Sequence, residues 1–396
     1  MGLSGRREKI AGDLEYPLLS YGETRGSGKF NNTFNAYFER FSSWKPGRPA
    51  RSAPMFNVVD FFCGCGGASL GFAIIPELFN IACGIDINPV SLESYAKNFG
   101  CPALHKDVRE LVRNETFSVS TIDEYIDGLP LITIGCAPCQ GFSAHRKKDW
   151  SKEEDDRNSL MENFAALATR LNPEYIIMEN VPEILRGKYE IRYARARSIF
   201  QQNGYFVTER VYNAAGFYVP QARRRAIVVA SRKPFQLPQP VLRPEEYRTA
   251  RDAIGNLPRA NGQSGDPYHI CSRHRQSTID VLARVPADGG SRPHGVGPPC
   301  LDRVKGFSDV YGRVAWDKPS VTITKTARNP ATGRFAHPEE NRGLTVREAA
   351  RFQGFPDSYI FCGGFGKKFE QIGEAVPPPL ALAIAAEISL VERARV

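Results

Sequence analysis

The fold follows from Val58-Val59-Asp60-Phe61-Phe62-Cys63-Gly64-Cys65-Gly66-Gly67, an apolar strand that runs into a glycine-rich turn. A helix-like stretch, Ala68 to Ile75, comes directly after it. Glycines in such a turn permit positive φ and let the backbone approach a ligand closely. Asp86 ends the next apolar strand, 19 residues past Gly67. A carboxylate there can accept both ribose hydroxyls of a nucleoside cofactor.

Outward from this turn, short apolar strands alternate with helical patterns from residue 57 to residue 231. The candidate strands are Val58–Phe62, Ile81–Ile87, Leu131–Cys136, Tyr175–Glu179, Phe206–Val211 and Ala226–Ala230. The candidate helices between them are Val90–Asn98, Leu160–Leu171 and Arg195–Gln202. This alternation predicts an α/β domain with a mainly parallel sheet, whose ligands lie at the carboxyl ends of the strands.

The glycine pattern departs from the dinucleotide fingerprint. Gly64-x-Gly66-Gly67 is not G-x-G-x-x-G, and no helix N-terminus is clearly offered to a pyrophosphate. The pattern therefore favours a nucleoside without phosphates. Asp107 follows a third strand-like position, where its carboxylate could take an adenine amino group.

Composition indicates a globular chain with a polyanionic partner. The 396 residues are 42% apolar and 24% charged, and the net charge is +9. Residues 232–318 hold 14 Lys and Arg against 9 Asp and Glu, so over half of the excess lies there. No run approaches the roughly 20 apolar residues of a membrane span, and no secretory signal opens the sequence. We expect a monomer in the cytoplasm, on the nucleoid.

Residue composition and hydrophobic periodicity divide the chain into four parts. Residues 1–54 read as an N-terminal extension and linker, in which Phe34, Tyr37, Phe38 and Phe41 have helical spacing. Residues 55–232 form the predicted cofactor-binding domain. Residues 233–340 lack periodicity and suggest a loop-rich second domain. In residues 341–396, Thr345 and Glu348 have the spacing of a capping box, and a final apolar helix is long enough to pack back onto the α/β domain.

Cys139 is the candidate nucleophile. It lies in Gly135-Cys136-Ala137-Pro138-Cys139-Gln140-Gly141-Phe142-Ser143, directly after a predicted buried strand. Cys136 and Cys139 also form a Cys-x-x-Cys pair, which is typical of redox dithiols and zinc half-sites. A zinc site with Cys63 and Cys65 is disfavoured because those cysteines lie in the turn where the cofactor would bind. We expect no metal and, with nine scattered cysteines, reduced thiols.

Taken together, the motifs resemble those of the cytosine-5 DNA methyltransferases of bacterial restriction-modification systems, in the family's order. Phe62-x-Gly64-x-Gly66-Gly67 resembles the first motif, Pro138-Cys139-Gln140 the nucleophile motif, and Met178-Glu179-Asn180-Val181 the Glu-Asn-Val motif. Gln221-x-Arg223-x-Arg225 and the stretch from Arg342 to Pro356 are similar to two later motifs. The last motif, usually Gly-Asn-x-Val-Pro-Pro, has Glu374 in place of Asn.

The resemblance implies an S-adenosylmethionine-dependent methyltransferase with a Rossmann-like sheet and a smaller target-recognition domain. The implied catalytic residues are Cys139, Glu179, Arg223 and Arg225. The implied cofactor-binding residues are Phe62, Gly64, Gly66, Gly67, Asp86, Ile87, Asp107, Val108, Pro138, Leu160, Glu374, Ala375 and Val376. The implied DNA contacts are Gln140, Ser143, Arg146, Lys147, Lys148 and Gln221, the basic run being a candidate gate over a flipped nucleotide.

The family's chemistry explains why these residue types are needed. The Cys139 thiolate adds to carbon-6 of cytosine, which makes carbon-5 nucleophilic. Glu179 binds N3 and the exocyclic amine, and should be protonated or share a proton during the addition. Arg225, with Arg223 near it, would hold the carbonyl oxygen of the base.

Four classes of function remain open at this point. They are a methyltransferase acting on duplex DNA, an RNA cytosine-5 methyltransferase, a catalytically idle DNA-binding homologue, and a disulfide oxidoreductase. Intact Cys139, Glu179 and Arg225 argue against the idle homologue. The long second domain favours duplex DNA over RNA. The recognised sequence, and a partner such as a restriction enzyme or defence complex, are not deducible from the chain.

Overall fold

The fold is built on a seven-stranded sheet. The computed structural model describes residues 28–48, 54–113, 122–137, 160–187, 190–260, 265–303 and 308–395. The strand order is β3-β2-β1-β4-β5-β7-β6. The strands are β1 (Phe56–Phe61), β2 (Phe79–Asp86), β3 (Ala103–His105), β4 (Leu131–Gly135), β5 (Tyr175–Asn180), β6 (Phe206–Asn213) and β7 (Arg224–Ser231). The predicted mainly parallel α/β sheet is confirmed.

Parallel pairing joins β3, β2, β1, β4 and β5, whereas β7 runs antiparallel to both β5 and β6. Parallel strands covered on both faces read as continuous apolar runs, and every residue of β1 and β4 is buried. The carboxyl ends of β1, β2, β4 and β5 therefore meet at one edge of the sheet. β7 runs the other way, so its beginning lies at that same edge, with Asn180 opposite Ala226.

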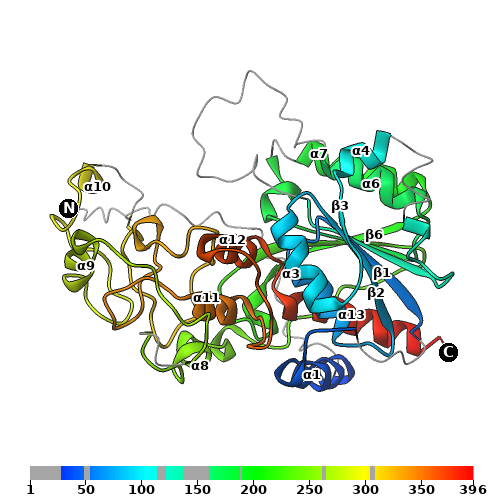
Figure 1. Ribbon diagram of the computed structural model, residues 1–396. Helices are drawn as coiled ribbons and strands as arrows, with labels where there is room; N and C mark the ends of the chain where they lie inside the picture. Colours follow the sequence, from blue (N-terminus) through cyan, green and yellow to red (C-terminus); the bar gives the residue numbers. More distant parts are fainter. Residues whose placement is uncertain are drawn as a thin grey trace, which may run out of the picture.

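Helices cover both faces of the sheet (Figure 1). One layer contains α4 (Val108–Arg113), α6 (Leu160–Arg170) and α7 (Glu190–Gln202). The other contains α1 (Gly28–Ser43), α2 (Gly67–Ala73), α3 (Pro89–Phe99) and α13 (Pro378–Arg393). Alternation along β1 sends Val58 into the core of the second layer and Val59 and Phe61 into the core of the first.

Helix α13 packs against α2, and α1 packs against α13. Helix α1 buries Phe34, Tyr37 and Phe41 of the predicted set, and Phe30 besides, while Phe38 is only partly buried. Tyr37 Oη lies 3.0 Å from Ser389 Oγ of α13. A Cβ on Gly71 of α2 would lie 2.4 Å from the backbone nitrogen of Leu382. Only glycine allows α2 and α13 to approach this closely.

Residues from about 232 to 345 form a second lobe with little regular structure (Figure 1). Its helices are α8 (Ala250–Ile254), α9 (Gln276–Ala283) and α10 (Cys300–Arg303). The guanidinium of Arg313 is buried and donates to the carbonyls of Leu282, Val285, His337 and Glu340. Buried backbone carbonyls need hydrogen-bond donors, and in this lobe the Arg313 guanidinium supplies the donors that neighbouring strands would supply in a sheet.

Two further helices, α11 (Val346–Gln353) and α12 (Phe365–Glu374), connect this lobe to the sheet. The predicted capping box is confirmed, because Thr345 Oγ1 accepts from the Glu348 backbone and Glu348 Oε2 accepts from the Thr345 backbone. Glu348 is also paired with Arg342 at 2.8 Å. Burial opposes ionisation of Glu348, but the bonds from Arg342 and Thr345 hold its pKa below the ordinary value.

Within the described ranges, one stretch, Phe365–Arg393, is long and apolar enough by composition to span a membrane. Packing accounts for that character, since 72% of its most apolar window is buried inside the protein.

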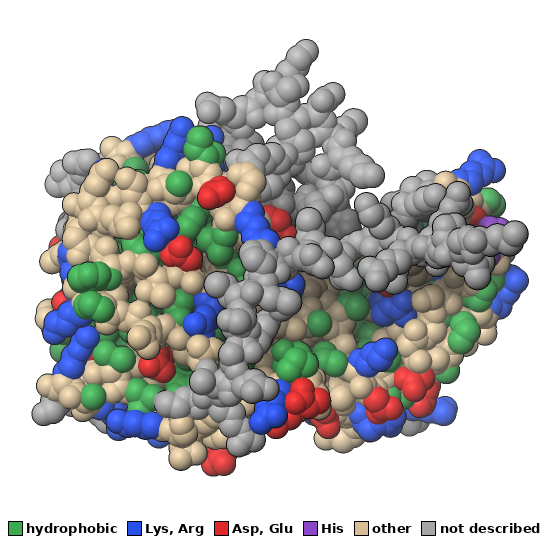
Figure 2. Space-filling model, turned by 180° about the vertical axis from the view of Figure 1, so that it is seen from behind, with side chains coloured by type: hydrophobic (Ala, Val, Ile, Leu, Met, Phe, Trp, Pro, Cys, Tyr) green, Lys and Arg blue, Asp and Glu red, His purple; other side chains and the backbone are tan. Residues whose placement is uncertain are grey.

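Charge is mixed over the back of the molecule. Figure 2 shows Lys and Arg side chains on both lobes of this face, interleaved with Asp and Glu. The net charge of +9 is therefore not gathered into one patch there.

Candidate active site

The glycine turn forms an open cradle at the carboxyl end of β1. Phe62, Gly64 and Gly66 have φ of 56°, 52° and 98°. A left-handed conformation is unusual for an aromatic residue and concentrates at functional sites. A Cβ on Gly64 would meet nothing within 4 Å, whereas one on Gly66 would lie 2.3 Å from the ring of Phe99. The turn is thus tight on its inner side and open on its outer side.

Asp86 joins the end of β2 to this turn. Its Oδ2 accepts from the Gly64 backbone at 2.9 Å and its Oδ1 from the Asn88 backbone at 2.8 Å. Each carboxylate oxygen has two lone pairs, so capacity for hydroxyl donors remains. Burial raises the pKa of Asp86, while the backbone donors lower it.

Two residues near Asp86 add an exposed apolar side chain and a second carboxylate to this edge of the sheet. Ile87 is 63% exposed, which leaves a large apolar side chain in solvent beside Asp86. The carboxylate of Asp107 binds Arg109, with Oδ2 2.6 Å from Nη2, and this bond lowers its pKa. Val108 and Leu160 are buried at the starts of α4 and α6.

The segment after α12 closes the inner side of the cradle. A Cβ on Gly67 would lie 2.3 Å from the Val376 carbonyl oxygen and 3.0 Å from the Cβ of Ala375. Glu374 ends α12 with its side chain 54% exposed, 3.9 Å from Lys325. Residues some 310 apart in the chain therefore form one wall.

Glu179 and Arg225 form an ion pair at the same edge of the sheet. Glu179 lies near the end of β5 and Arg225 near the beginning of β7, and Arg225 Nε is 2.7 Å from Glu179 Oε1. Their side chains are 11% and 14% exposed, so the pair is largely shielded from water. A guanidinium in this position fixes the direction of the carboxylate.

Asn180 connects this pair to β4. Its Nδ2 donates to the Ala137 carbonyl at 3.1 Å, and its own Oδ1 accepts from the Val181 backbone. Ala137 is the last described residue before the predicted nucleophile. Asn180 belongs to the Glu-Asn-Val motif, but the sequence does not reveal its role, because a buried amide–carbonyl contact across 43 residues leaves no local signal.

Arg223 has a different position from the one expected. Its guanidinium is 3% exposed and donates to the carbonyls of Ile323, Gly373 and Ala375. The prediction that it assists Arg225 at the base is therefore corrected. Arg223 precedes the first residue of β7, so its side chain enters the packing between the lobes, where buried carbonyls need a donor.

Gln221 also differs from the prediction. It is completely buried, donates to the Phe352 carbonyl and Gln353 Oε1, and accepts from the Ile323 backbone. A side chain enclosed in this way does not reach DNA, so the predicted DNA contact is wrong. Gln353 in turn donates to the Ala375 carbonyl at 2.6 Å. Gln221, Arg223 and Gln353 together hold the segment after α12 in place.

Several predicted site residues lie outside the described ranges. They are Pro138, Cys139, Gln140, Ser143, Arg146, Lys147 and Lys148. Cys136 is half-buried and packs against the main core. Burial raises the pKa of the Cys63 and Cys65 thiols, which favours the protonated form over the thiolate that zinc binds. Among the described residues, no three His, Cys, Asp or Glu converge to hold a metal ion.

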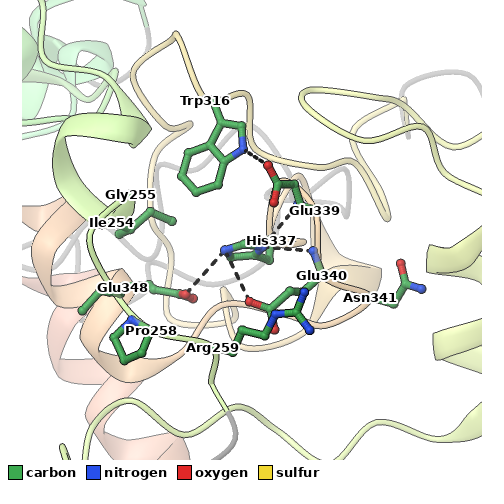
Figure 3. Close-up of a pocket in the computed structure, with 11 residues that line it drawn as sticks. Ile254, Gly255, Pro258, Arg259, Trp316, His337, Glu339, Glu340, Asn341 and Glu348 are labelled. Atoms are coloured by element: carbon green, nitrogen blue, oxygen red, sulfur yellow. Dashed lines mark hydrogen bonds and ion pairs between the residues drawn. The ribbon is translucent and has the colours of Figure 1, made fainter. Parts of the chain in front are cut away.

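A separate cavity of about 460 Å³ lies in the second lobe. Figure 3 shows His337 between Glu348 and Glu340, with Trp316 and Glu339 on the other side. His337 Nδ1 accepts from the Glu339 and Glu340 backbones, and Trp316 Nε1 donates to Glu339. Its lining includes none of the residues at the strand ends.

The fold and the strand-end residues define an S-adenosylmethionine-dependent methyltransferase of the α/β class. The model of the C-5 cytosine-specific DNA methylases matches residues 56–390, and the chain belongs to this family. Its members transfer the methyl group of S-adenosylmethionine to carbon-5 of cytosine in DNA.

Curated relatives agree with this assignment. Type II methylase M.HgiDII of Herpetosiphon aurantiacus is 34% identical over 348 residues, which span 84% of this chain and 94% of the relative. Type II methyltransferase M1.HphI of Haemophilus parahaemolyticus is 33% identical, with 83% and 85% covered.

Solved structures share the fold. A DNA modification methyltransferase encoded within an E. coli prophage has a TM-score of 0.65 at 22% identity, with 85% of this chain and 99% of that chain covered. The S. pombe Dnmt2 methyltransferase has a TM-score of 0.54 at 18% identity, with 86% and 99% covered.

The described residues fit S-adenosylmethionine. The backbone at Gly64 faces open space and carries no side chain, so a ligand can approach it closely. Asp86 keeps acceptor capacity for ribose hydroxyls, and exposed Ile87 offers an apolar contact for a purine. When bound, this group supplies an electrophilic methyl on a sulfonium.

Proposed function

We propose that this chain methylates carbon-5 of a flipped cytosine in a specific duplex DNA sequence through a covalent Cys139 adduct. The observation that carries the proposal is the Arg225–Glu179 ion pair of 2.7 Å, next to the strand that leads to Cys139. A carboxyl group that is shielded from water and held in one direction can bind N3 and the exocyclic amine of cytosine.

The reaction would proceed by addition to the base followed by elimination. The Cys139 sulfur bonds to carbon-6 while Glu179 delivers a proton to N3, which leaves an enamine. Carbon-5 then takes the methyl group and loses its proton to a base such as water, and the bond from carbon-6 to sulfur breaks to restore the thiolate. N3 returns its proton to Glu179, so both residues end in their starting forms. Arg225 would orient Glu179 and hold the carbonyl oxygen of the base.

The cofactor would lie in the cradle. We propose that Asp86 binds the ribose, that Phe62, Ile87, Asp107 and Val108 surround the adenine, and that the backbone from Gly64 to Gly67 follows the methionine end. Ala375, Val376 and Glu374 would complete that end, and Pro138 and Leu160 would also contact the cofactor. The open side of Gly64 supports this arrangement.

The second lobe would read the target. We propose that residues 233–340 form the target-recognition unit, and that the segment with Gln140, Ser143, Arg146, Lys147 and Lys148 closes on DNA around the flipped nucleotide. A small separate apolar core around Leu282, Val296 and Val310 supports a distinct region within this range, whose Ala250 and Ile323 belong to the main core.

The central test is covalent trapping with Cys136 as the matched control. A duplex carrying 5-fluorocytosine at the target should form a stable adduct with the wild type and with Cys136→Ser, and none with Cys139→Ser. The 5-fluoro group blocks proton removal, so the adduct accumulates. Transfer of labelled methyl groups to DNA by Cys139→Ser would contradict the mechanism.

Substrate class and partner follow from a second experiment. Sequencing 5-methylcytosine in a methylation-free host that expresses the chain should reveal one DNA sequence, and RNA from the same cells should carry no added label. We infer that the chain is the modification member of a restriction-modification pair, since its relatives are Type II methyltransferases. Host DNA should then resist a restriction enzyme specific for the mapped sequence.

We further propose a monomer that works in the cytoplasm on nucleoid DNA. Light scattering at micromolar concentration should give a mass near 44.0 kDa. A mass near twice this value would contradict the monomer.

A further inference from the structure

Asp60 is a buried carboxylate near the end of β1, just before the glycine turn. Its side chain is 1% exposed, and it lies opposite Gly84 of β2 in the sheet. Oδ2 accepts from Ser69 Oγ at 2.6 Å, whereas Oδ1 has no hydrogen-bond partner within the described ranges. A buried carboxylate with an unsatisfied oxygen costs stability, and such groups concentrate at functional sites.

Ser69 links Asp60 to α3. Ser69 Oγ lies 2.8 Å from Tyr95 Oη, and both side chains are fully buried. The one hydroxyl hydrogen of Ser69 goes to Asp60, so Tyr95 donates to Ser69. Gly84 makes room for the ring, because a Cβ there would lie 2.5 Å from two carbons of Tyr95. Packing and hydrogen bonds thus both specify the chain from Tyr95 through Ser69 to Asp60.

This hydrogen-bond chain joins the elements that carry both parts of the cradle. The glycine turn lies between β1, with Asp60, and α2, with Ser69. Asp86 lies between β2 and α3, with Tyr95. On the cradle itself, the turn and Asp86 meet through the bond from the Gly64 backbone. The chain is therefore a second connection between the same two segments, inside the core.

We propose that ionised Asp60 is a positioning residue of the cofactor site, which holds the glycine turn and the Asp86 segment together through Ser69 and Tyr95. This inference rests on the proposed function of the cradle. Asp60 acts through its neighbours, because it is enclosed in the core and does not reach a ligand.

The hydrogen-bond chain requires the ionised form of Asp60. A proton on Oδ2 would stop Ser69 from donating there, so Ser69 would turn its hydrogen to Tyr95. The Tyr95 hydroxyl hydrogen would then lose its acceptor. A proton on Oδ1 would have no acceptor within the described ranges. Either way a buried donor is left unsatisfied, and the connection between the two segments weakens.

The surroundings bring this ionisation into the neutral range. Burial raises the pKa of Asp60 to about 7 against the Ser69 hydroxyl and backbone, which lower it, and the charge of Asp86 raises it further. The other titratable groups that interact with Asp60 are thiols and phenols, and their own pKa values are raised, so they are neutral at pH 7. They are Cys63, Cys65, Cys83, Tyr95, Cys101 and Tyr359.

The experiment is isothermal titration calorimetry of S-adenosylhomocysteine on the full chain, without DNA, from about pH 6 to about pH 8.5. Wild-type affinity should fall about tenfold toward pH 6, because about a tenth of the molecules then hold the ionised carboxylate. Ser69→Ala breaks the chain and leaves Asp60 protonated. It should bind about tenfold more weakly than the wild type at pH 8.5 and show no further fall.

Asp60→Asn removes the titration and keeps an acceptor for Ser69. Its affinity should be the same at pH 6 and pH 8.5, to within about twofold, although Asp86 is still present. Thr133→Val is the matched control, since Thr133 is also fully buried in the sheet and its hydroxyl has no hydrogen-bond partner within the described ranges. It should keep both the affinity and the pH dependence of the wild type.

Three results would overturn the inference alone. They are a wild type whose affinity does not fall, a Ser69→Ala protein with wild-type binding, and a full fall in Asp60→Asn, which would assign the titration to another group. Urea unfolding checks that each variant is folded, and Ser69→Ala decides if Asp60→Asn is not. A folded wild type that binds no S-adenosylhomocysteine at any pH would overturn the proposed function as well.

Discussion

Asn180 connects the end of β5, which carries Glu179, with Ala137 beyond β4. It spans the ends of β4 and β5, and its donor bond to Ala137 fixes the backbone two residues before Cys139 relative to the carboxylate of Glu179. A buried amide in such a position acts through geometry, because small displacements of a nucleophile cost large factors in rate.

Asn180→Ala should therefore reduce kcat about 100-fold while the free energy of unfolding falls by only about 1 to 2 kcal/mol. Asn180→Asp should fail similarly, because a carboxylate cannot donate to the Ala137 carbonyl. Single-turnover methylation and urea unfolding measure the two quantities.

Asn57→Ala supplies the comparison. Asn57 is also buried and hydrogen-bonded, to Asp127, but lies at the opposite end of the sheet. The Asn57→Ala variant should have a lower free energy of unfolding than the wild type but the same kcat. Equal losses of kcat in Asn180→Ala and Asn57→Ala would show that Asn180 has no positioning role.

At the scale of elements, the contact between α2 and α13 holds the glycine turn in place. Helix α2 begins at Gly67, directly after the glycine turn, so a displacement of α2 moves the cofactor site. Gly71 is the point of closest approach, since its missing side chain leaves room for the backbone at Ala381 and Leu382.

Gly71→Ala should destabilise the fold by about 2 to 3 kcal/mol, because the added methyl meets backbone atoms that cannot move aside. Thermal and urea unfolding would report this change. Gly364→Ala should be within about 0.5 kcal/mol of the wild type, since a Cβ there meets nothing within 4 Å and φ is −71°. A neutral Gly71→Ala would show that the two helices separate freely.

At the scale of the whole molecule, Arg223 joins three parts of the chain. Its guanidinium connects the beginning of β7 with Ile323 of the second lobe and with the carbonyls of Gly373 and Ala375 beside the cradle. Arg223 therefore helps to fix the second lobe relative to the cradle, together with Gln221 and Gln353.

Arg223→Gln should lower the free energy of unfolding by about 3 kcal/mol, because it leaves buried carbonyls without charged donors. It should also weaken S-adenosylhomocysteine binding in calorimetry. Arg224→Gln, at the exposed neighbouring position, should change neither quantity. A stable Arg223→Gln protein with normal cofactor affinity and no kcat would restore the direct catalytic role expected from sequence.

Much of the site could be predicted because it depends on strand ends. Strand periodicity and the glycine turn place Asp86 and Glu179 at one edge, since carboxyl ends of parallel strands converge. Arg225 lies at the beginning of β7, and only the antiparallel direction of that strand brings it to the same edge. The three-residue strand β3 was not delimited because so short an element carries no periodicity. Family motifs indicated which residue types mattered, but not which of them face a ligand.

The sequence by itself determined the α/β class and the glycine turn at Gly64, because these depend on local pattern, while the family resemblance implied that Arg225 orients Glu179. Only the tertiary structure separated Arg225, which contacts Glu179, from Arg223 and Gln221, which are buried between the lobes. The physical reason is that their partners lie 100 to 150 residues away, and a buried carbonyl needs a donor wherever packing brings one.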